Sequence, residues 1–485
     1  MSAPSVRLTW VDPRGRQSTD FHEQPPLNPV ASPPPPKSAP PLRLGGAARA
    51  LALEIAAETR AEWGYATDVI ARAFRAHREL GSTERRRISE TVYGLIRADR
   101  RLDAIVAELL EPVSRAGEKP SQVVRDELKL IAFELREGIP VEAVRNDMRR
   151  LLRTEVDLAA VVEPDAGLGT RTGLDRDAVR SSVPTWLAEL VTRERGHDEG
   201  LALIDSMNQR APLAIRVNTA LTTRDALIKE LGEEGVTARP GKWSATALVL
   251  ETRVNAFGLS AFRRGLFEVM DEGSQLVAEL VAPPPGGRVL DACAGAGGKT
   301  LALAAALAGK GRVLAIDTDG KKLEELRRRA RRAGLNNVAA RAIDRDETTL
   351  PAEALPAAWD RVLVDAPCSG LGVLRRNPEA RWRLSAAAVA GFPPRQISLL
   401  VTYAPLVAVG GRLIYATCSI LADENERVIE RFLAERDDFV RVPVKEIWGK
   451  ARVEELGQGT DGFLRLDPGR HDADGFFGAI LRRVR

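Results

Sequence analysis

Residues 286–317 read GGRVLDACAGAGGKTLALAAALAGKGRVLAID, and the expected architecture follows from this stretch. A short apolar strand ending at Asp291 leads into a glycine-rich turn, then into an apolar helical segment, and then into a second strand ending at Asp317. The alternation continues to the end of the chain, in DRVLVDA, GRLIYATCS and GFFGAILRR. Residues 271–485 are therefore predicted to form an α/β domain with a mostly parallel sheet and helices on both faces.

The residues before 271 fall into regions that differ in composition. Residues 1–44 are rich in proline and lack an apolar period, which predicts a disordered arm. Residues 45–165 place apolar side chains three and four positions apart, which predicts an all-helical domain. A stretch rich in Gly, Asp, Thr and Arg from Glu163 to about Ser182 is expected to be a linker. Residues 180–270 mix helical segments with short strands, which indicates a small α+β domain.

Length and composition exclude several classes of protein. The 485 residues are 44% apolar, but no apolar run approaches the roughly 20 residues that span a bilayer, and the N-terminus lacks an apolar leader. We therefore expect a cytoplasmic protein with no membrane partner, and a monomer. Three cysteines are too few for a disulfide framework and lack the paired spacing of a zinc site, so no metal is expected. The net charge of +4 means that any polyanion is bound by local clusters of basic residues.

The turn DACAGAGGKT, residues 291–300, is compatible with three kinds of site. A dinucleotide fingerprint that starts at Gly295 requires glycine at position 300, where the chain has Thr300. A phosphate-binding loop is matched by the tail GKT, but its first glycine would fall on Cys293. Asp365, after an apolar strand, could then be the partner acid of the phosphate site. An ATPase or GTPase therefore stays open as an alternative.

The third alternative is a site for S-adenosylmethionine, in which the backbone of the turn packs against the methionine part of the cofactor. Asp317 ends the next strand, 26 residues beyond Asp291, and could accept hydrogen bonds from both ribose hydroxyls. Asp317 could instead cap the helix that begins near Gly320.

Two cysteines decide between these chemistries. Cys368 and Cys418 follow the ends of two predicted strands and would converge above the sheet if those strands are neighbours. A thiol close to arginines and helix N-termini has a lowered pKa and becomes a nucleophile. Methylation at carbon 5 of a pyrimidine requires a nucleophile that adds to carbon 6, whereas phosphoryl transfer requires no thiol. Each cysteine alone could be an unreactive buried residue, but the pair favours the methyltransferase.

Several segments resemble the motifs of bacterial RNA cytosine-5 methyltransferases, above all the small-subunit ribosomal RNA family called RsmB, Sun or Fmu. The resembling segments are VMDEGSQLVAELV, VLDACAGAGGKT, DAPCSGLGVLRRNPEARW, YATCS with the following ENE at residues 424–426, and RAPLAIRVN. Upstream, RRRISETVYGLIRADRRLD is similar to the NusB-like RNA-binding domain of that family. The resemblance implies a Rossmann-like, S-adenosylmethionine-dependent methyltransferase of 16S ribosomal RNA, with another RNA such as tRNA as the alternative substrate.

The resemblance also implies roles for individual residues. Cys418 would be the nucleophile, Cys368 would assist release of the methylated base, Asp365 would hold the polar edge of the cytosine, and Lys299 would reach toward the active site. The residues expected to line the S-adenosylmethionine pocket are Cys293, Ala294, Gly295, Ala296, Gly297, Gly298, Lys299, Asp317, Asp344 and Asp365.

The chain departs from the family pattern in two places. Ala296 stands where the family commonly has proline, which could alter the stiffness of the turn. After the third strand, both Asp344 and Asp346 are eligible to contact adenine, and Asp344 is preferred because it ends the apolar run.

Arginines suggest where RNA would bind. The loop after Cys368 is expected to contact RNA through Arg375, Arg376, Arg381, Trp382 and Arg383. The helical domain would add a phosphate-facing cluster of Arg85, Arg86, Arg87, Arg97, Arg100 and Arg101. The basic helix at residues 321–332 is expected to be a solvated face instead. An RNA-binding assembly factor without catalytic activity remains a second alternative.

Overall fold

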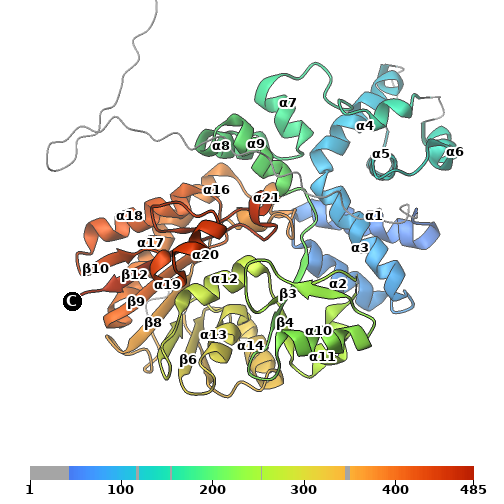
Figure 1. Cartoon of the computed structure of the whole chain (residues 1–485). Helices are drawn as coiled ribbons and strands as arrows, with labels where there is room; N and C mark the ends of the chain where they lie inside the picture. Colours follow the sequence, from blue (N-terminus) through green and yellow to red (C-terminus); the bar gives the residue numbers. More distant parts are fainter. Residues whose placement is uncertain (1–42, 116–119, 153–155, 253, 345–349) are drawn as a thin grey trace, which may run out of the picture. The chain divides into compact units, whose positions relative to one another are not determined.

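The computed structural model describes residues 43–115, 120–152, 156–252, 254–344 and 350–485 (Figure 1). The predicted proline-rich arm therefore lies outside the described residues, except for its last two positions, and so does Asp346. No helix among the described residues is both long and apolar enough to cross a membrane.

Amphipathic helices fill the first described part of the chain. They are α1 (Gly46–Glu62), α2 (Ala66–Ala76), α3 (Ser82–Arg97), α4 (Asp99–Arg115), α5 (Gln122–Arg136) and α6 (Val141–Leu152). Their apolar stripes meet in cores that include Ile88 with Val92, and Leu102 with Leu128. Helix α5 begins where Ser121 accepts a hydrogen bond from the amide of Val124, which satisfies one free donor of the first turn.

Three further helices lead to the small sheet: α7 (Gly173–Arg180), α8 (Thr185–Arg195) and α9 (His197–Ser206). Helix α7 falls inside the stretch that was predicted to be a linker, so that prediction is wrong for residues 173–180. The glycine and threonine at its start mark the beginning of a helix, and Ala178 and Val179 pack in hydrophobic cores.

A four-stranded antiparallel sheet follows, in the order β2-β3-β1-β4. Its strands are β1 (Leu213–Val217), β2 (Ala238–Pro240), β3 (Ala247–Leu250) and β4 (Phe267–Val269), with helices α10 (Arg224–Glu233) and α11 (Ser260–Arg263) between them. Leu227, Leu231 and Phe267 pack together in its core.

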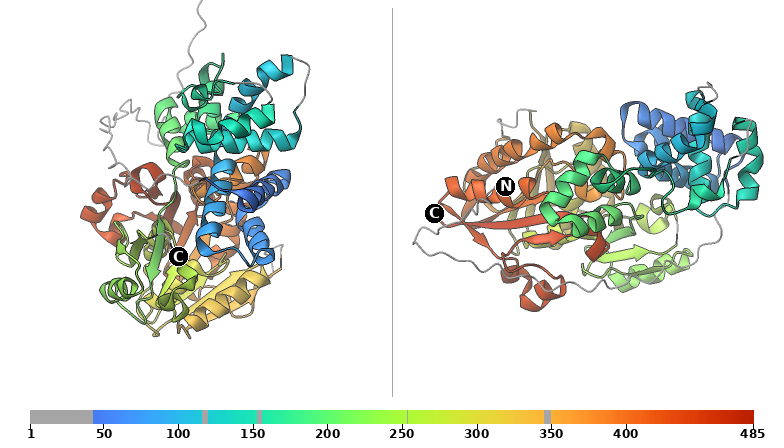
Figure 2. Two further views of the ribbon diagram at one scale, coloured as in Figure 1. Left: turned by 90° about the vertical axis from the view of Figure 1, so that its right-hand side faces the viewer. Right: turned by 90° about the horizontal axis from the view of Figure 1, so that it is seen from above.

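The large sheet has the order β10-β12-β9-β8-β5-β6-β7, with β11 paired to β12. Figure 1 labels β10, β12, β9, β8 and β6 among its strands, and Figure 2 shows the same ribbon from two further directions. Its strands are β5 (Arg288–Asp291), β6 (Arg312–Asp317), β7 (Val338–Ala342), β8 (Trp359–Asp365), β9 (Val407–Thr417), β10 (Phe439–Val442), β11 (Leu464–Leu466) and β12 (Phe476–Arg483). The pairs formed among β5 to β9 are parallel, and β12 runs antiparallel to β9.

Both faces of this sheet are covered, because successive side chains of a strand point to opposite sides. Leu290 packs with helices α17 (Phe392–Tyr403) and α18 (Glu426–Glu435) on one face. Val289, its neighbour in β5, packs with α12 (Glu272–Val281) and α13 (Gly298–Ala306) on the other. The predicted fold class, a helix-covered α/β domain preceded by a small α+β sheet and an all-helical region, is confirmed.

Candidate active site

The predicted site residues meet at the carboxyl edge of the large sheet. Strand β5 pairs with β6 on one side and with β8 on the other, so the direction of winding reverses between β5 and β8. In open α/β sheets, ligands bind outside the strand ends at such a point. Asp291, Asp317 and Asp365 each end one of these three strands, and Cys418 directly follows the neighbouring strand β9.

The glycine turn is held in one conformation by contacts with its surroundings. Gly297 has a φ of +86°, and a Cβ at this position would lie 2.5 Å from the side chain of Leu326, so the turn requires glycine here. The carbonyl of Ala296 accepts a hydrogen bond of 2.7 Å from Arg329, whose guanidinium also pairs with Glu268 at 3.0 Å. The turn is thus fixed from outside, although it lacks the proline common in the family.

The acids near the turn have separate tasks. Asp319, and not Asp317, caps helix α14 (Gly320–Arg332) by accepting from the amides of Lys321 and Lys322. Asp317 accepts from the amides of Gly295, at 2.7 Å, and Asp319, at 2.8 Å, so the alternative of Asp317 as the cap is wrong.

The remaining predicted pocket residues occupy different positions around the turn. Cys293 is half-buried against the core, and the amide of Ala294 donates to the carbonyl of Ile316 at 3.0 Å. Apart from the adjacent residues and, for Gly298, the backbone of its own helix, a Cβ on Gly295 or Gly298 would meet no atom of the described residues within 4 Å, so space is open beside the turn. Asp344 is exposed just beyond strand β7.

Lys299, in the first turn of α13, points at the end of β8. Its Nζ lies 2.7 Å from Oδ2 of Asp365 and 5.1 Å from the centre of the Phe476 ring. Burial disfavours the charged ammonium, but the nearby Asp365, Cys418 and Asp291 outweigh this effect and raise the pKa of Lys299. The lysine is therefore a permanent cation between the glycine turn and the thiols.

Asp291 is buried below the turn and is 1% exposed. Thr300 donates a hydrogen bond of 2.6 Å to its Oδ2, while Oδ1 has no partner among the described residues. Burial, together with the charge of Asp365, raises the pKa of Asp291 from 3.8 to about 7, against the opposing effect of the Thr300 hydrogen bond. In the sequence, Asp291 is recognisable only as the end of an apolar strand.

This raised pKa makes the stability of the protein depend on pH. The protonated carboxyl favours the folded state below about pH 4, and that contribution is lost as the pH rises through the folded-state pKa of about 7. Replacing Asp291→Asn removes the titration while keeping an oxygen for Thr300. The variant is therefore expected to gain stability relative to the unmodified protein between about pH 4 and pH 7, by up to about 4 kcal/mol. Urea unfolding at about pH 5 and pH 8 measures the difference in the free energy of unfolding between the two proteins. A difference that is the same at both pH values would contradict the prediction.

The two predicted thiols lie together. The Sγ atoms of Cys368 and Cys418 are 3.3 Å apart, and both residues are half-buried. The amide of Gly372 donates to the carbonyl of Cys418 at 2.9 Å, which ties the two cysteine loops to each other. The hydrogen bond with Cys418 and burial raise the pKa of Cys368 well above its usual range. The expectation of a lowered pKa is thus wrong for Cys368, which is held as a thiol.

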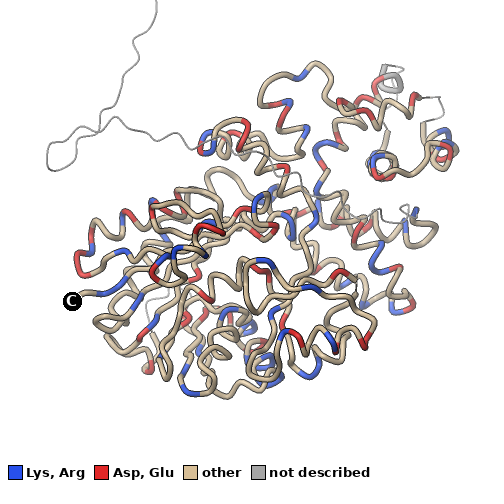
Figure 3. The backbone as a smooth tube through the Cα atoms, in the orientation of Figure 1, with Lys and Arg blue, Asp and Glu red and all other residues tan. Residues whose placement is uncertain are grey.

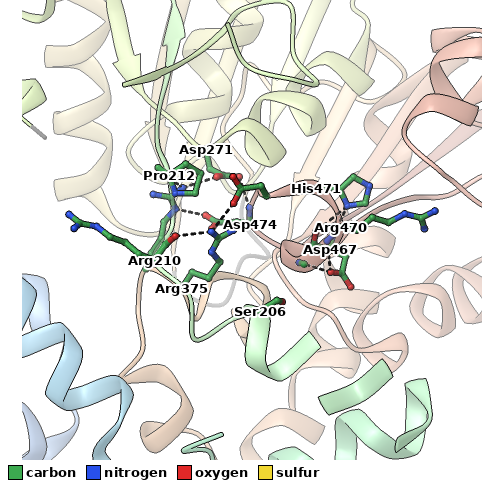
Figure 4. Close-up of polar contacts among 12 residues, drawn as sticks. Ser206, Arg210, Pro212, Asp271, Arg375, Asp467, Arg470, His471 and Asp474 are labelled. Carbon is green, nitrogen blue, oxygen red and sulfur yellow. Dashed lines mark hydrogen bonds and ion pairs between the residues drawn. The ribbon is translucent and has the colours of Figure 1, made fainter. Parts of the chain in front are cut away.

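Two of the arginines after Cys368 do not line an open RNA surface. Arg375 is 4% exposed and donates to the carbonyl of Arg210 at 2.8 Å (Figure 4). It also donates to Asp472 at 2.8 Å. Arg381 is fully buried and donates to Asn208 at 2.5 Å. The prediction that these two arginines bind RNA phosphates is wrong, because their guanidinium groups fix internal loops.

Arg376 and Trp382, two other members of this loop, also make internal contacts. Arg376 pairs with Asp271 and Asp474, at 2.7 and 2.5 Å. Trp382 packs against Trp63, with ring centres 5.6 Å apart, and donates to the carbonyl of Ile96 at 3.0 Å. Arg383 is exposed and lies 4.3 Å from the centre of the Tyr65 ring, which is itself 51% exposed, so its contact with RNA stays a prediction.

Three arginines of the predicted cluster in the helical region also donate hydrogen bonds to backbone carbonyls of the protein. Arg97 donates to the carbonyl of Arg375, Arg100 to that of Val183 and Arg101 to that of Pro164. Basic and acidic residues are interspersed along the described chain (Figure 3). The cluster is therefore not a phosphate-facing surface as a whole.

The basic helix α14 was expected to be solvated. Arg329 and Arg332 instead pair with the buried Glu268 of the small sheet, while Arg328 is largely exposed. The expectation is thus wrong for the two arginines that face the small sheet.

Comparison with known proteins identifies the family. The family model described as 16S rRNA methyltransferase RsmB/F matches residues 278–482, and that of the RsmF/B-like ferredoxin-like domain matches residues 183–256. A probable ribosomal RNA small subunit methyltransferase B from Synechocystis sp. is 32% identical over 454 residues, which cover 90% of this chain and 99% of the relative. The chain belongs to the RsmB/F family of 16S rRNA methyltransferases.

A second relative has the same name, and two solved structures share the fold. The probable ribosomal RNA small subunit methyltransferase B of Bacillus subtilis is 30% identical, over 84% of this chain and 92% of the relative. The crystal structure of PH0851 matches with a TM-score of 0.74 at 26% identity, over 91% of this chain and all of that one. NSun6 from Pyrococcus horikoshii, solved with SFG, has a TM-score of 0.53 at 19% identity, covers 62% of this chain and 98% of that one, and shows the shared fold.

RsmB/F proteins are Rossmann-like methyltransferases of ribosomal RNA that depend on S-adenosylmethionine, so the predicted family and cofactor are confirmed. The described residues contain no cluster of three or more His, Cys, Asp or Glu side chains suited to a metal ion.

Proposed function

We propose that this RsmB/F protein methylates carbon 5 of a cytosine in 16S ribosomal RNA through a covalent bond between Cys418 and the base. The Cys418 thiolate adds to carbon 6, and the electron pair of the carbon 5–carbon 6 double bond makes carbon 5 nucleophilic. When bound, S-adenosylmethionine would supply the electrophilic methyl group, and S-adenosylhomocysteine would leave with the electron pair of the broken sulfur–carbon bond. Loss of the proton from carbon 5 to solvent then restores the double bond and expels the thiolate.

The distance of 3.3 Å between the two Sγ atoms carries this proposal. Cys368 and Cys418 come from different strand ends, 50 residues apart, and both lie at the edge that holds the glycine turn. With its raised pKa, Cys368 keeps its proton and can transfer it to the Cys418 sulfur, 3.3 Å away, as that sulfur leaves carbon 6, which a serine hydroxyl is too weak an acid to do. The two thiols therefore have different tasks, nucleophile and assistant in release.

Lys299 and Asp365 would prepare the base for addition. Addition to carbon 6 requires the cytosine ring to accept electrons, which a group on its polar edge promotes. We assign this role to Asp365, whose carboxylate is oriented by the Nζ of Lys299 at 2.7 Å.

The residues around the glycine turn fit S-adenosylmethionine. The space beside Gly295 and Gly298 admits the methionine part close to the backbone. Asp317 stands at the tip of β6, where a carboxylate suits a ribose without a 2′-phosphate. We propose Asp344, exposed beyond β7, for the adenine contact.

A nucleoside triphosphatase is the second candidate. It requires Lys299 to bind the phosphates of the nucleotide. The contact of Lys299 with Asp365 and the replacement of the first loop glycine by Cys293 favour the methyltransferase. A non-catalytic assembly factor would require neither the thiol pair nor the open turn.

We further propose that residues 45–165 form a NusB-like RNA-binding domain, residues 180–270 a connecting domain and residues 271–485 the catalytic domain. Such a protein would act as a monomer on ribosomal RNA in the cytoplasm.

Bisulfite mapping tests the proposed function. Small-subunit RNA from cells that lack the gene is expected to lose one or more 5-methylcytosines, and the purified full-length protein with S-adenosylmethionine is expected to restore them. Transfer RNA from the same cells is the control for the alternative substrate. Unchanged 5-methylcytosine in the RNA of these cells, or ATP or GTP hydrolysis that depends on Lys299, would overturn the proposal.

A further inference from the structure

Glu424 is a fully buried carboxylate next to the two cysteine loops, and it takes no part in the methyl transfer proposed for Cys418 and Cys368. Its Oε1 accepts hydrogen bonds from Ser369 Oγ at 2.5 Å and Ser419 Oγ at 2.6 Å. Each of these serines directly follows one of the cysteines. One oxygen atom thus joins the two loops immediately beside the thiols.

The second oxygen of Glu424 secures the Cys368 loop from both sides. Oε2 accepts from the amide of Ser369 at 2.8 Å and from Nε2 of Gln396 at 3.1 Å. Nε2 of Gln396 also lies 3.1 Å from the carbonyl of Pro367, and Gln396 is itself fully buried in α17. The residues before and after Cys368 are therefore both linked to the same carboxylate.

The next residue, Asn425, secures the Cys418 loop from both sides. Its Oδ1 accepts from Thr417 Oγ1 at 2.5 Å, and its Nδ2 donates to the carbonyl of Ser419 at 3.0 Å. Tyr415 in β9 donates to the carbonyl of Glu424 at 2.5 Å, which fixes the position of this short segment on the sheet. Both residues that flank Cys418 are thereby held by residues 424–425.

We propose that Glu424 is a positioning residue that sets the separation of the Cys368 and Cys418 thiols. The inference rests on the proposed function, because it assumes that both thiols act on one cytosine. A buried carboxylate that accepts three hydrogen bonds from the two loops and a fourth from α17 fixes those loops more firmly than a neutral acceptor would, since hydrogen bonds to a charged group are the stronger ones. A shift of about 1 Å in a reacting group can reduce a rate about 100-fold.

The test measures the thiol geometry separately from methyl transfer. Diamide, a diazene, takes up two electrons and two protons as two neighbouring thiols become a disulfide. The full-length protein is treated with diamide, and the Cys368–Cys418 peptide is followed by mass spectrometry. The same preparations are assayed for kcat and for the KM of S-adenosylmethionine with small-subunit RNA. The variants are Glu424→Ala, Glu424→Gln and Ser419→Ala.

The matched control is Asp423→Asn, which removes the adjacent carboxylate. Asp423 is 49% exposed and pairs with Arg427 on the surface. The control is expected to behave as the unmodified protein in both measurements.

Glu424→Ala is expected to slow disulfide formation about 10-fold and kcat about 100-fold, with an unchanged KM for S-adenosylmethionine. Glu424→Gln is expected to stay within about 5-fold of the unmodified protein in kcat, because serine hydroxyls can turn to accept from the new amide. Ser419→Ala keeps the carboxylate and removes one link, so it is expected to slow disulfide formation even if Glu424→Ala does not fold.

Disulfide formation at the unmodified rate in the folded Glu424→Ala protein, or in Ser419→Ala when Glu424→Ala does not fold, would overturn this inference. Failure of the proposed function has a different signature. In that case the Glu424 variants would still change the rate of thiol coupling, but the unmodified protein would produce no 5-methylcytosine.

Discussion

Cys418→Ser is expected to reduce methyl transfer at least about 10³-fold while binding of S-adenosylmethionine is retained. A serine hydroxyl is far less acidic than a thiol, so at neutral pH the variant has no anionic nucleophile to add to carbon 6. The substitution changes one atom in a half-buried side chain and leaves the glycine turn and Asp317 untouched. Transfer of a radiolabelled methyl group to small-subunit RNA, together with calorimetric titration of the cofactor, measures the two properties separately.

The unaltered fold of the Cys418→Ser protein is the control for this result. Its thermal unfolding midpoint is expected to match that of the unmodified protein, since Cys418 makes no disulfide. Retention of more than about a tenth of the turnover by this variant would show that Cys418 is not the nucleophile.

Cys368→Ser is expected to accumulate a covalent complex between the protein and its RNA. Cys418 remains available to add to carbon 6, but the thiol 3.3 Å away that assists its departure is gone. Loss of such assistance typically costs about 10²-fold or more in rate. The complex is detected as a shifted band on a denaturing gel with labelled RNA and S-adenosylmethionine, and turnover is measured in parallel.

The double variant Cys368→Ser with Cys418→Ser is the control, because it lacks the attacking sulfur and should give no shifted band. A Cys368→Ser protein that forms no complex and turns over normally would overturn the division of tasks between the two thiols.

The motifs near the strand ends could be placed from sequence because their positions follow from local rules. Strands that alternate with helices form a parallel sheet, and the carboxyl ends of such strands share one edge. That rule brought Asp317, Asp365, Cys368 and Cys418 to one site, where the structure places them. Their individual roles remain predictions, as do the domain boundaries.

Sequence patterns did not predict the contacts of side chains whose partners are far away in the sequence. A run of arginines after a catalytic turn has the same composition whether it faces RNA or other protein loops. Arg375 and Arg381 proved to be internal because segments more than 100 positions away supply the acceptors Arg210 and Asn208. The direction of the pKa shift of Cys368 was predicted wrongly for the same reason, because the hydrogen bond with the Cys418 sulfur and burial determine whether the pKa rises or falls.

Glu424 was visible in the sequence as part of the motif ENE, but nothing in its spacing connects it with Ser369, 55 positions earlier. Periodicity and turn chemistry thus determined the sheet, its helices and the edge at which the thiols lie, because these depend on residues close together in the chain. The partners of buried charges, the separation of the two sulfur atoms and the protonation of Asp291 were decided only by tertiary structure, because hydrogen bonding and desolvation depend on contacts that folding brings together.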